Sequence, residues 1–265
     1  MKRFSFAKTT NSLPAPPRNN IIGKPFVELS SVDSTNNYAM RQVQNGLAEH
    51  GAAYFAIEQT KGKGQRTKQW QSARGENIIL SIVVNTSSFA ISQQFVLSII
   101  SALSVLDLFN KYTTKKTLIK WPNDIYFDDR KAAGILIENL LQGSHWRFAV
   151  IGFGVNINQL VFDASLKNPV SLKQITTEHY DVKLLAYELC SHLQRRLEQF
   201  ESDKAQGMLA EYNNVLYRKN TVTRFKVGAR IFSAAVKCVN KDGSLVVGDG
   251  LEESFEFGRI EWLIG

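Results

Sequence analysis

The sequence has very few of the residues that build disulfides and metal clusters. Its 265 residues include two cysteines, Cys190 and Cys238, which lie far apart and form no Cys-x-x-Cys spacing. A disulfide framework or a cysteine-based zinc cluster is therefore not expected, and a reducing cytoplasm is the predicted location. The four histidines form no HExxH or other ligand spacing, so the sequence predicts no transition-metal site built by the protein alone.

Long hydrophobic runs are also lacking. The longest apolar stretch, residues 95–109, is interrupted by three serines and Asp107, and we judge it too short for a membrane span. Residues 1–24 have no apolar signal-peptide core and contain the run Pro-Ala-Pro-Pro at positions 14–17. We predict that these residues form a disordered basic tail and that the protein makes no membrane contact.

The surplus of positive charge is local. The chain has 32 Lys and Arg residues against 24 Asp and Glu residues, a formal net charge of +8. Residues 1–27 supply five basic side chains and no acidic one, and residues 61–74 hold a second basic cluster. From residue 221 onward, six basic residues balance six acidic ones. The continuous basic face of a nucleic-acid-binding protein is therefore not predicted.

The rest of the sequence mixes strand and helix patterns. An apolar period of three to four residues predicts helices over residues 91–112 and from residue 182 onward, and Ser34, Thr35 and Asn36 stand where another helix would begin. Strands are predicted at residues 25–29, 53–59, 77–84, 118–121, 125–127, 131–141 and 146–156. Hairpins combined with helices indicate an α+β fold with a mixed, mainly antiparallel sheet.

After residue 220 the pattern changes. Short β segments separated by glycine-containing turns follow one another between residues 222 and 264. This pattern is typical of a small all-β barrel. We therefore predict three parts: the tail at residues 1–24, a larger α+β domain at residues 25–218, and a small β domain at residues 219–265.

Residues 59–70, QTKGKGQRTKQW, combine glycines with cations and end in a tryptophan. Glycines let backbone N–H groups approach an anion closely. Lys63, Arg66 and Lys68 could neutralise phosphates, and Trp70 could cover a flat ring such as adenine. The GxxxxGK[ST] pattern of a P-loop is absent. A flexible basic surface loop explains the same residues equally well.

Residues 120–131, KWPNDIYFDDRK, are the most informative stretch. Turn chemistry explains Pro122, Asn123 and Asp124 without any function. It does not explain Lys131, which begins the otherwise apolar strand AAGILI. Because a lysine at the edge of a core needs an anionic partner, this position favours a functional role.

Two further motifs are weak when taken alone. Residues 151–156, IGFGVN, contain GxG but not GxGxxG. Glycines inside a strand indicate either close passage of a ligand or tight packing. Residues 34–36, STN, would cap a helix by default, and the same polar trio could bind a small polar head group such as a ureido ring.

Taken in order, these four motifs resemble the biotin–protein ligases. The family pattern runs STN, then Gln with a glycine-and-basic loop ending in Trp, then KWPND…RK..GIL.E, then IG.G.N. The matching positions here are residues 34–36, Gln59 with residues 62–70, residues 120–138, and residues 151–156. The KWPND element with its downstream lysine is highly specific, and the resemblance spans about residues 26–265.

The resemblance implies a catalytic domain like that of class II aminoacyl-tRNA and biotin synthetases, followed by an SH3-like barrel. It also implies a two-step reaction. Biotin attacks the α-phosphate of ATP to give biotinyl-AMP, and a lysine of a biotin carboxyl carrier protein domain then takes the biotinyl group. Mg²⁺ is expected to arrive with the ATP phosphates rather than in a protein cage.

Residue roles follow from the resemblance position by position. Lys131 is implied to bind the biotin carboxylate and then the α-phosphoryl oxygens, and Asp124 to orient or deprotonate the incoming lysine. The implied catalytic residues are Lys131, Arg66 and Asp124. The implied biotin site consists of Ser34, Thr35, Asn36, Gln59, Lys63, Gly64, Lys131, Gly134, Gly152 and Gly154. The implied ATP site consists of Lys63, Arg66, Lys68, Trp70, Asn123, Lys131 and Asn156.

Two loop positions depart from the family pattern. Gln65 stands where many members carry Arg, and a neutral side chain there weakens phosphate neutralisation or retention of the adenylate. Thr67 replaces a frequent glycine, which could stiffen the loop. The chemistry is still expected, because the cations that remain are Lys63, Arg66, Lys68 and Lys131.

Some family members carry an N-terminal winged helix-turn-helix that represses genes. About 25 residues precede the larger domain here, which is too few for such a module. We therefore expect no sequence-specific DNA binding by that route. The sequence leaves the oligomeric state open between a monomer and a weak homodimer.

Two other functions explain part of the sequence. A lipoate–protein ligase would share the fold and the chemistry, but it is expected to carry an Arg-Arg…Ser-Gly-Gly-Gly loop, which this chain lacks. A non-catalytic nucleic-acid-binding protein would need aromatic and cationic side chains on one face. Here the cations concentrate in a tail and one loop.

Overall fold

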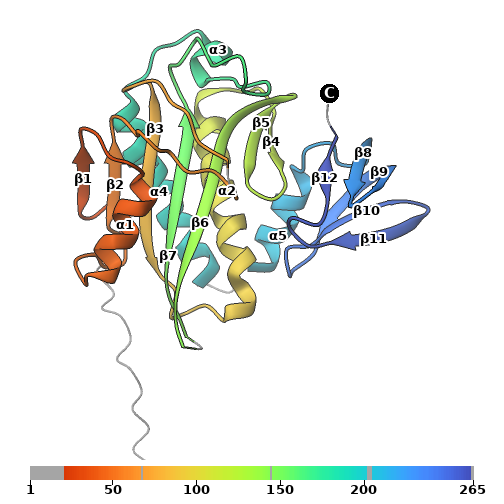
Figure 1. The fold of residues 1–265 in the computed structure, drawn as a ribbon, viewed down its shortest axis with the longest axis horizontal. Helices are drawn as coiled ribbons and strands as arrows, with labels where there is room; N and C mark the ends of the chain where they lie inside the picture. The colour runs from red at the N-terminus through yellow and green to blue at the C-terminus, as the bar shows by residue number, and fades with distance from the viewer. Residues whose placement is uncertain (1–20, 67, 144, 202–204, 264–265) are drawn as a thin grey trace, which may run out of the picture.

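A seven-stranded sheet forms the main layer of the protein (Figure 1). The computed structural model describes residues 21–263 except 67, 144 and 202–204, so most of the predicted tail and Thr67 lie outside the described residues. The strand order is β1-β2-β3-β7-β6-β5-β4. The strands are β1 Phe26–Leu29, β2 Ala53–Ala56, β3 Asn77–Asn85, β4 Thr117–Lys120, β5 Asp124–Phe127, β6 Arg130–Gln142 and β7 His145–Asn156.

The pairing confirms the predicted mixed, mainly antiparallel sheet. Only β1 and β2 pair in parallel among these strands, and the other pairs are antiparallel. Strand β3 is central and almost wholly buried, which its run of isoleucine, leucine and valine predicts. Strand β2 ends three residues earlier than predicted, at Ala56 instead of residue 59.

Helices cover both faces of this sheet. They are α1 Thr35–Gln44, α2 Gln94–Tyr112 after the 3-10 turn Ile91–Gln93, α3 Leu172–Thr176, α4 Val182–Glu201 and α5 Ala205–Asn214. Helices α2 and α4 pack on one face, with the main core between them and the sheet (Figure 1). Helix α1 packs on the other face through a smaller cluster that includes Ala39, Val43, Val83 and Val150. Side chains alternate along each strand, so odd positions of β3, even positions of β6 between residues 134 and 140, and even positions of β7 between residues 148 and 154 face the α1 side.

The segment Ile91–Tyr112 is longer than the predicted apolar stretch. By length and composition alone this segment could cross a membrane. However, 56% of its most apolar 18-residue stretch is buried inside the protein. Eleven residues of α2 are buried, and the helix packs against α4 and the sheet. It therefore serves as the central core helix of this fold.

A second, five-stranded antiparallel sheet follows, as the change of pattern after residue 220 predicts. Its order is β11-β10-β9-β8-β12. This arrangement is consistent with the predicted SH3-like barrel, and the boundary at residues 218–219 stays a prediction. The indole N–H of Trp121 connects the first sheet to this second sheet by donating to the carbonyl of Gly243 at 2.9 Å. The strands are β8 Val222–Val227, β9 Arg230–Val239, β10 Leu245–Asp249, β11 Leu251–Phe255 and β12 Glu261–Trp262.

Arg196 joins three helices. Its guanidinium donates to Asp107 of α2 at 2.8 and 2.7 Å and to Glu211 of α5 at 2.7 Å in both contacts, while its own side chain is 11% exposed. Without it, both carboxylates would lose their guanidinium partner, and Asp107 would keep, among the described residues, only His192, whose Nδ1 lies 3.8 Å away, as a possible ion-pair partner. We expect Arg196→Met to lower the free energy of unfolding by about 2–4 kcal/mol, less than a fully buried pair would give because Glu211 is partly solvated.

Urea denaturation measures this change. The matched control is Arg74→Met, because Arg74 pairs with Glu58 on the surface and such pairs contribute little. Equal effects of the two substitutions would show that the Arg196 cluster is not a stabilising centre.

Candidate active site

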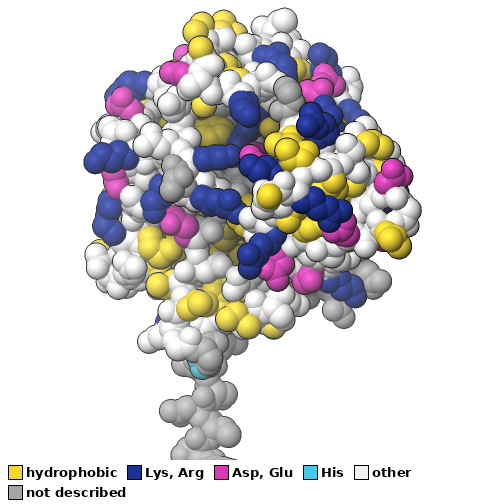
Figure 2. Space-filling model, turned by 45° about the vertical axis from the view of Figure 1, so that its right-hand side comes forward, with side chains coloured by type: hydrophobic (Ala, Val, Ile, Leu, Met, Phe, Trp, Pro, Cys, Tyr) yellow, Lys and Arg dark blue, Asp and Glu magenta, His cyan; other side chains and the backbone are white. Residues whose placement is uncertain are grey.

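A cavity of about 530 Å³ opens on the α1 side of the sheet. The strands contribute its floor, residues 63–65 and 68–71 of the basic loop form one wall, and residues 162, 165–167 and 169 form another. Figure 2 shows a hollow with Lys and Arg side chains gathered around it. The sequence predicted fifteen of the residues that line the cavity: Ser34, Thr35, Asn36, Gln59, Lys63, Gly64, Lys68, Trp70, Asn123, Asp124, Lys131, Gly134, Gly152, Gly154 and Asn156.

One end of the cavity is polar and uncharged. Ser34 caps α1 by accepting from the backbone N–H of Asn37 at 3.5 Å, so the predicted cap is present. The next residue, Thr35, donates to Gln59 Oε1 from its backbone N–H at 2.7 Å and from its hydroxyl at 3.1 Å. The helix cap and the polar site are therefore two uses of the same three residues.

Ser81 and Glu138 extend this polar network. The Ser81 hydroxyl donates to Asn36 Oδ1 at 2.6 Å and lies 2.7 Å from Thr35 Oγ1. The Asn36 amide donates to Glu138 Oε2 at 2.9 Å. Glu138 in turn pairs with Lys63 Nζ at 3.0 Å, which ties the basic loop to β6. These hydrogen bonds fix the orientation of the Thr35, Asn36 and Ser81 side chains at this end of the cavity.

The strand glycines make room for side chains of this same site. A Cβ atom on Gly152 would lie 2.2 Å from Asn36 Oδ1. A Cβ atom on Gly154 would lie 2.4 Å from Trp70 Cε2, and one on its cross-strand partner Gly134 would lie 3.1 Å from Trp70 Cζ3. The glycines therefore make room for Asn36 and the Trp70 indole, which is close packing around the cavity. That a ligand also passes close to them stays a prediction.

The other end of the cavity is cationic. Lys131 Nζ lies 2.7 Å from Asp124 Oδ1, and both side chains are partly exposed to the cavity. The same ammonium lies 5.7 Å from the centre of the Trp70 ring. The lysine that the sequence left without a partner thus pairs with the aspartate of the KWPND turn, and the two stay accessible to a ligand.

Lys120 stands beside this pair. Its Nζ lies 3.3 Å from the Tyr126 hydroxyl. Burial lowers the pKa of Lys120, and the neighbouring ammonium groups of Lys131, Lys68 and Lys167 lower that pKa further, whereas Asp124 opposes the change. Four cations with a single carboxylate form a site suited to a polyanion such as a triphosphate.

The two predicted asparagines hold the backbone. The Asn123 amide donates to the carbonyl of Ile135, and the backbone N–H of Ile135 donates back to the Asn123 carbonyl at 3.0 Å. The Asn156 amide donates to the carbonyls of Val170 at 3.2 Å and Lys131 at 3.4 Å. Both asparagines line the cavity, and their side-chain amides fix the strand carrying Lys131.

Arg66 is the one predicted site residue that the structure leaves out of the cavity lining. It lines a neighbouring hollow with Lys61, Lys63 and Glu138. Its guanidinium lies over the ring of Phe257, with Cζ 5.6 Å from the ring centre. The prediction that Arg66 contacts phosphates thus has no support from its position in this structure.

Comparisons with known proteins agree with this geometry. The model of the biotin/lipoate A/B protein ligase family matches residues 28–156, a span that contains all four motifs. The bifunctional ligase/repressor BirA of Escherichia coli is 29% identical over 244 residues, covering 90% of this chain and 74% of that protein. A biotin–[acetyl-CoA-carboxylase] ligase of Mycobacterium tuberculosis is 27% identical over 187 residues, covering 69% of this chain and 68% of that protein.

Solved structures share the fold. The biotin protein ligase of Aquifex aeolicus, determined with biotin and ATP, aligns with a TM-score of 0.76 at 22% identity, covering 89% of this chain and 97% of the other. That of Leishmania major, determined with biotinyl-5-AMP, aligns with a TM-score of 0.62 at 21% identity, covering 90% and 99%. The chain is thus similar to the biotin–protein ligases in sequence, and to their solved structures in fold.

The biotin–protein ligase motifs do not mark every residue of the site. Sequence reasoning missed Ser81 and Lys167 and gave no role to Lys120, Tyr126 and Glu138. Of these five residues, Lys120, Tyr126 and Lys167 line the cavity. Ser81 carries no local signal, because only the register that sets it opposite Gly152 brings it to Asn36. Lys167 lies in a segment without regular structure, where periodicity is uninformative.

Gln65 is where this chain departs from the biotin–protein ligase pattern. Its side chain lines both the main cavity and a second cavity of about 440 Å³. An amide at this position adds no positive charge to the phosphate end. The predicted weaker retention of the adenylate stays a prediction, and the effect predicted for Thr67 falls outside the described residues.

Proposed function

We propose that the Lys131–Asp124 pair carries out biotin adenylation and biotinyl transfer to a lysine of a biotin carboxyl carrier domain. The supporting observation is that this pair lies at the cationic end of a cavity whose other end is lined mainly by neutral polar side chains. An elongated ligand with a neutral head and an anionic tail fits that order of groups. Biotin has a ureido head and a carboxylate tail.

The polar end would hold the head group. Thr35, Asn36 and Ser81 present hydroxyl and amide groups, which can accept from and donate to a ureido ring. Gln59 keeps Thr35 in place. Lys63 and Gly64 stand at the loop edge of the cavity, where they would close over the bound acid.

The cationic end would carry the adenylation step. A biotin carboxylate oxygen attacks the α-phosphorus of ATP, a new P–O bond forms, and the bond to pyrophosphate breaks. Lys131 would exchange its contact with Asp124 for the carboxylate and then for the α-phosphoryl oxygens, stabilising charge as it develops. Lys68 and Lys120 would neutralise the remaining phosphates, and the Trp70 indole would shield the adenine.

Transfer would use the carboxylate freed by that exchange. Asp124 would accept a hydrogen bond from the incoming lysine amine and orient it toward the acyl carbon. The amine nitrogen forms the amide bond, the bond from the acyl carbon to AMP breaks, and the amine releases a proton.

Magnesium would come with the nucleotide. Among the described residues no group of three or more His, Cys, Asp or Glu side chains is placed to hold a metal ion, and Asp124 is the only carboxylate among those lining the cavity. Phosphate oxygens would therefore be the main ligands of Mg²⁺, which lowers the charge on the leaving pyrophosphate. A cytoplasmic location, a monomer or weak homodimer, and the lack of operator-specific DNA binding stay predictions.

Pyrophosphate release shows whether the enzyme activates biotin or the related acid lipoate. The protein is incubated with ATP and Mg²⁺ and with biotin, lipoate or neither. We expect biotin-dependent pyrophosphate release and none above background with lipoate. Release that depends on lipoate alone would overturn the proposal, and steeply salt-dependent nucleic-acid binding without any release would favour a binding protein instead.

Alkaline pH should weaken ATP binding through Lys120. Below its lowered pKa this lysine is charged and attracts phosphate, and as pH rises through that pKa the attraction is lost. We therefore expect the KM for ATP to rise on the alkaline side. Lys120→Arg keeps the charge, so it should move this rise to higher pH. The measurement is KM for ATP between about pH 7 and about pH 10, and identical profiles for the two proteins would refute the role of Lys120.

A further inference from the structure

The guanidinium of Arg66 rests on the turn that precedes β12 of the C-terminal sheet. Its Cζ lies 5.6 Å from the centre of the Phe257 ring. A Cβ atom on Gly258 would lie only 2.0 Å from Arg66 Nη2, so the absence of a side chain there is what makes room for the guanidinium. Arg66 itself has a φ of 58°, a left-handed conformation that costs a non-glycine residue free energy. Hydrogen bonds within the loop and the contact with the turn at Phe257 can both offset that cost.

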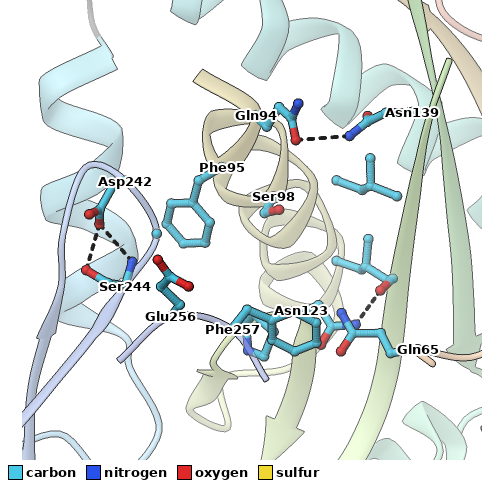
Figure 3. Close-up of a pocket in the computed structure, with 14 residues that line it drawn as sticks. Gln65, Gln94, Phe95, Ser98, Asn123, Asn139, Asp242, Ser244, Glu256 and Phe257 are labelled. Atoms are coloured by element: carbon cyan, nitrogen blue, oxygen red, sulfur yellow. Dashed lines mark hydrogen bonds between the residues drawn. The ribbon is translucent and has the colours of Figure 1, made fainter. Parts of the chain in front are cut away.

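The same turn also contacts the KWPND segment. The Phe257 ring meets the Trp121 ring edge-on, with centres 6.0 Å apart and planes at 71°. Phe257 therefore lies between Arg66 of the basic loop and Trp121 of the segment that carries Asp124. Figure 3 shows Phe257 with Gln65 and Asn123 in the second cavity, where all three are lining residues.

We propose that Phe257 and Gly258 are positioning residues for ATP, acting through Arg66. They hold the guanidinium on the C-terminal sheet, and the loop thereby presents Lys63, Lys68 and Trp70 to the cavity. Arg66 is then the anchor of the loop rather than a ligand of phosphate. This inference rests on the proposed function, since it concerns the ATP end of the same site.

A matched pair of glycine substitutions tests whether the turn at Gly258 holds the Arg66 guanidinium. Gly258 has a φ of +87°, and Gly250 in the same sheet has a φ of +95° with no atom within 4 Å of its added Cβ. Both alanine substitutions strain the backbone, but only Gly258→Ala pushes on Arg66. We expect Gly258→Ala to raise the KM for ATP roughly threefold to tenfold, in line with the loss of a cation–π contact, and Gly250→Ala to leave it unchanged.

Aromatic rescue and a double-mutant cycle separate anchoring from general disruption. Phe257→Tyr should keep the wild-type KM for ATP, and Phe257→Leu should raise it. If Arg66 is the anchor, Gly258→Ala should add nothing in an Arg66→Ala background. Additive effects on the KM for ATP, or an Arg66→Ala defect that no change at Phe257 or Gly258 reproduces, would overturn the proposal and make Arg66 a direct phosphate ligand.

Trypsin cleavage gives a readout that does not need activity. The loop offers cleavage sites at Lys61, Lys63 and Lys68. Loss of the anchor should speed cleavage there several-fold in Gly258→Ala relative to Gly250→Ala, because the loop opens more often. Equal cleavage rates would overturn the anchor. The two proposals can fail separately. If Gly258→Ala is cleaved faster but the wild type shows no biotin-dependent pyrophosphate release, the anchor is supported and the proposed function is refuted.

Discussion

Lys131→Ala should abolish biotinyl-AMP formation while leaving the fold intact. Lys131 Nζ is the ammonium paired with Asp124 at the cationic end of the cavity, and its side chain is partly exposed, so its removal opens no core. Removing a charge placed where negative charge develops typically costs about 10²–10³-fold in rate. The measurement is pyrophosphate release under single-turnover conditions, together with thermal unfolding of the same sample.

Two further variants make this result specific. Lys131→Arg keeps the charge with a different shape and should retain part of the rate. Lys115→Ala removes an exposed lysine in the turn after α2 and should behave as the wild type. If Lys131→Ala forms the adenylate at the normal rate, the role assigned to Lys131 is wrong.

Adding a methyl group at Gly152 should damage biotin binding, and adding one at Gly154 should damage ATP binding. The Gly152 methyl would collide with the Asn36 amide, which is buried and fixed in the first turn of α1. Displacing it breaks its hydrogen bonds with the buried Ser81 hydroxyl and with Glu138, at about 1–3 kcal/mol. We expect a rise in the KM for biotin of about tenfold to a hundredfold.

The Gly154 methyl would collide with Trp70, whose loop can move away. The expected rise in the KM for ATP is therefore smaller, about threefold to tenfold, matching a lost aromatic contact. Gly207→Ala in α5, where an added Cβ meets nothing within 4 Å, is the matched control. If the two substitutions affect the same substrate equally, the division of the cavity into a biotin end and an ATP end is mistaken.

Much of the fold follows from local sequence patterns. The apolar periods of α2 and α4 and the buried run of β3 are long enough to predict each element within a few residues. Helix α3 was not predicted, because five residues are too few for a helical period to appear. Thr35 shows why a motif can carry two meanings: one residue continues a capped helix and also contacts Gln59.

The parts of the site that escaped prediction depend on long-range geometry. Ser81 reaches Asn36 only because β3 and β7 pair in one register, and a shift by one residue would turn its hydroxyl to the other face. The resemblance implies that Arg66 contacts phosphate, and this stays a prediction. Its direction depends on its left-handed backbone and on Phe257, almost two hundred residues away along the chain.

Biotinylation of a carrier domain tests the central claim most directly. The protein is incubated with biotin, Mg²⁺ and a biotin carboxyl carrier domain, with and without ATP, and the carrier is probed with streptavidin. We predict a signal on the carrier only with ATP, and its loss when the acceptor lysine of the carrier is replaced by arginine. A carrier that stays unlabelled with ATP present, or is labelled equally without it, would contradict the account.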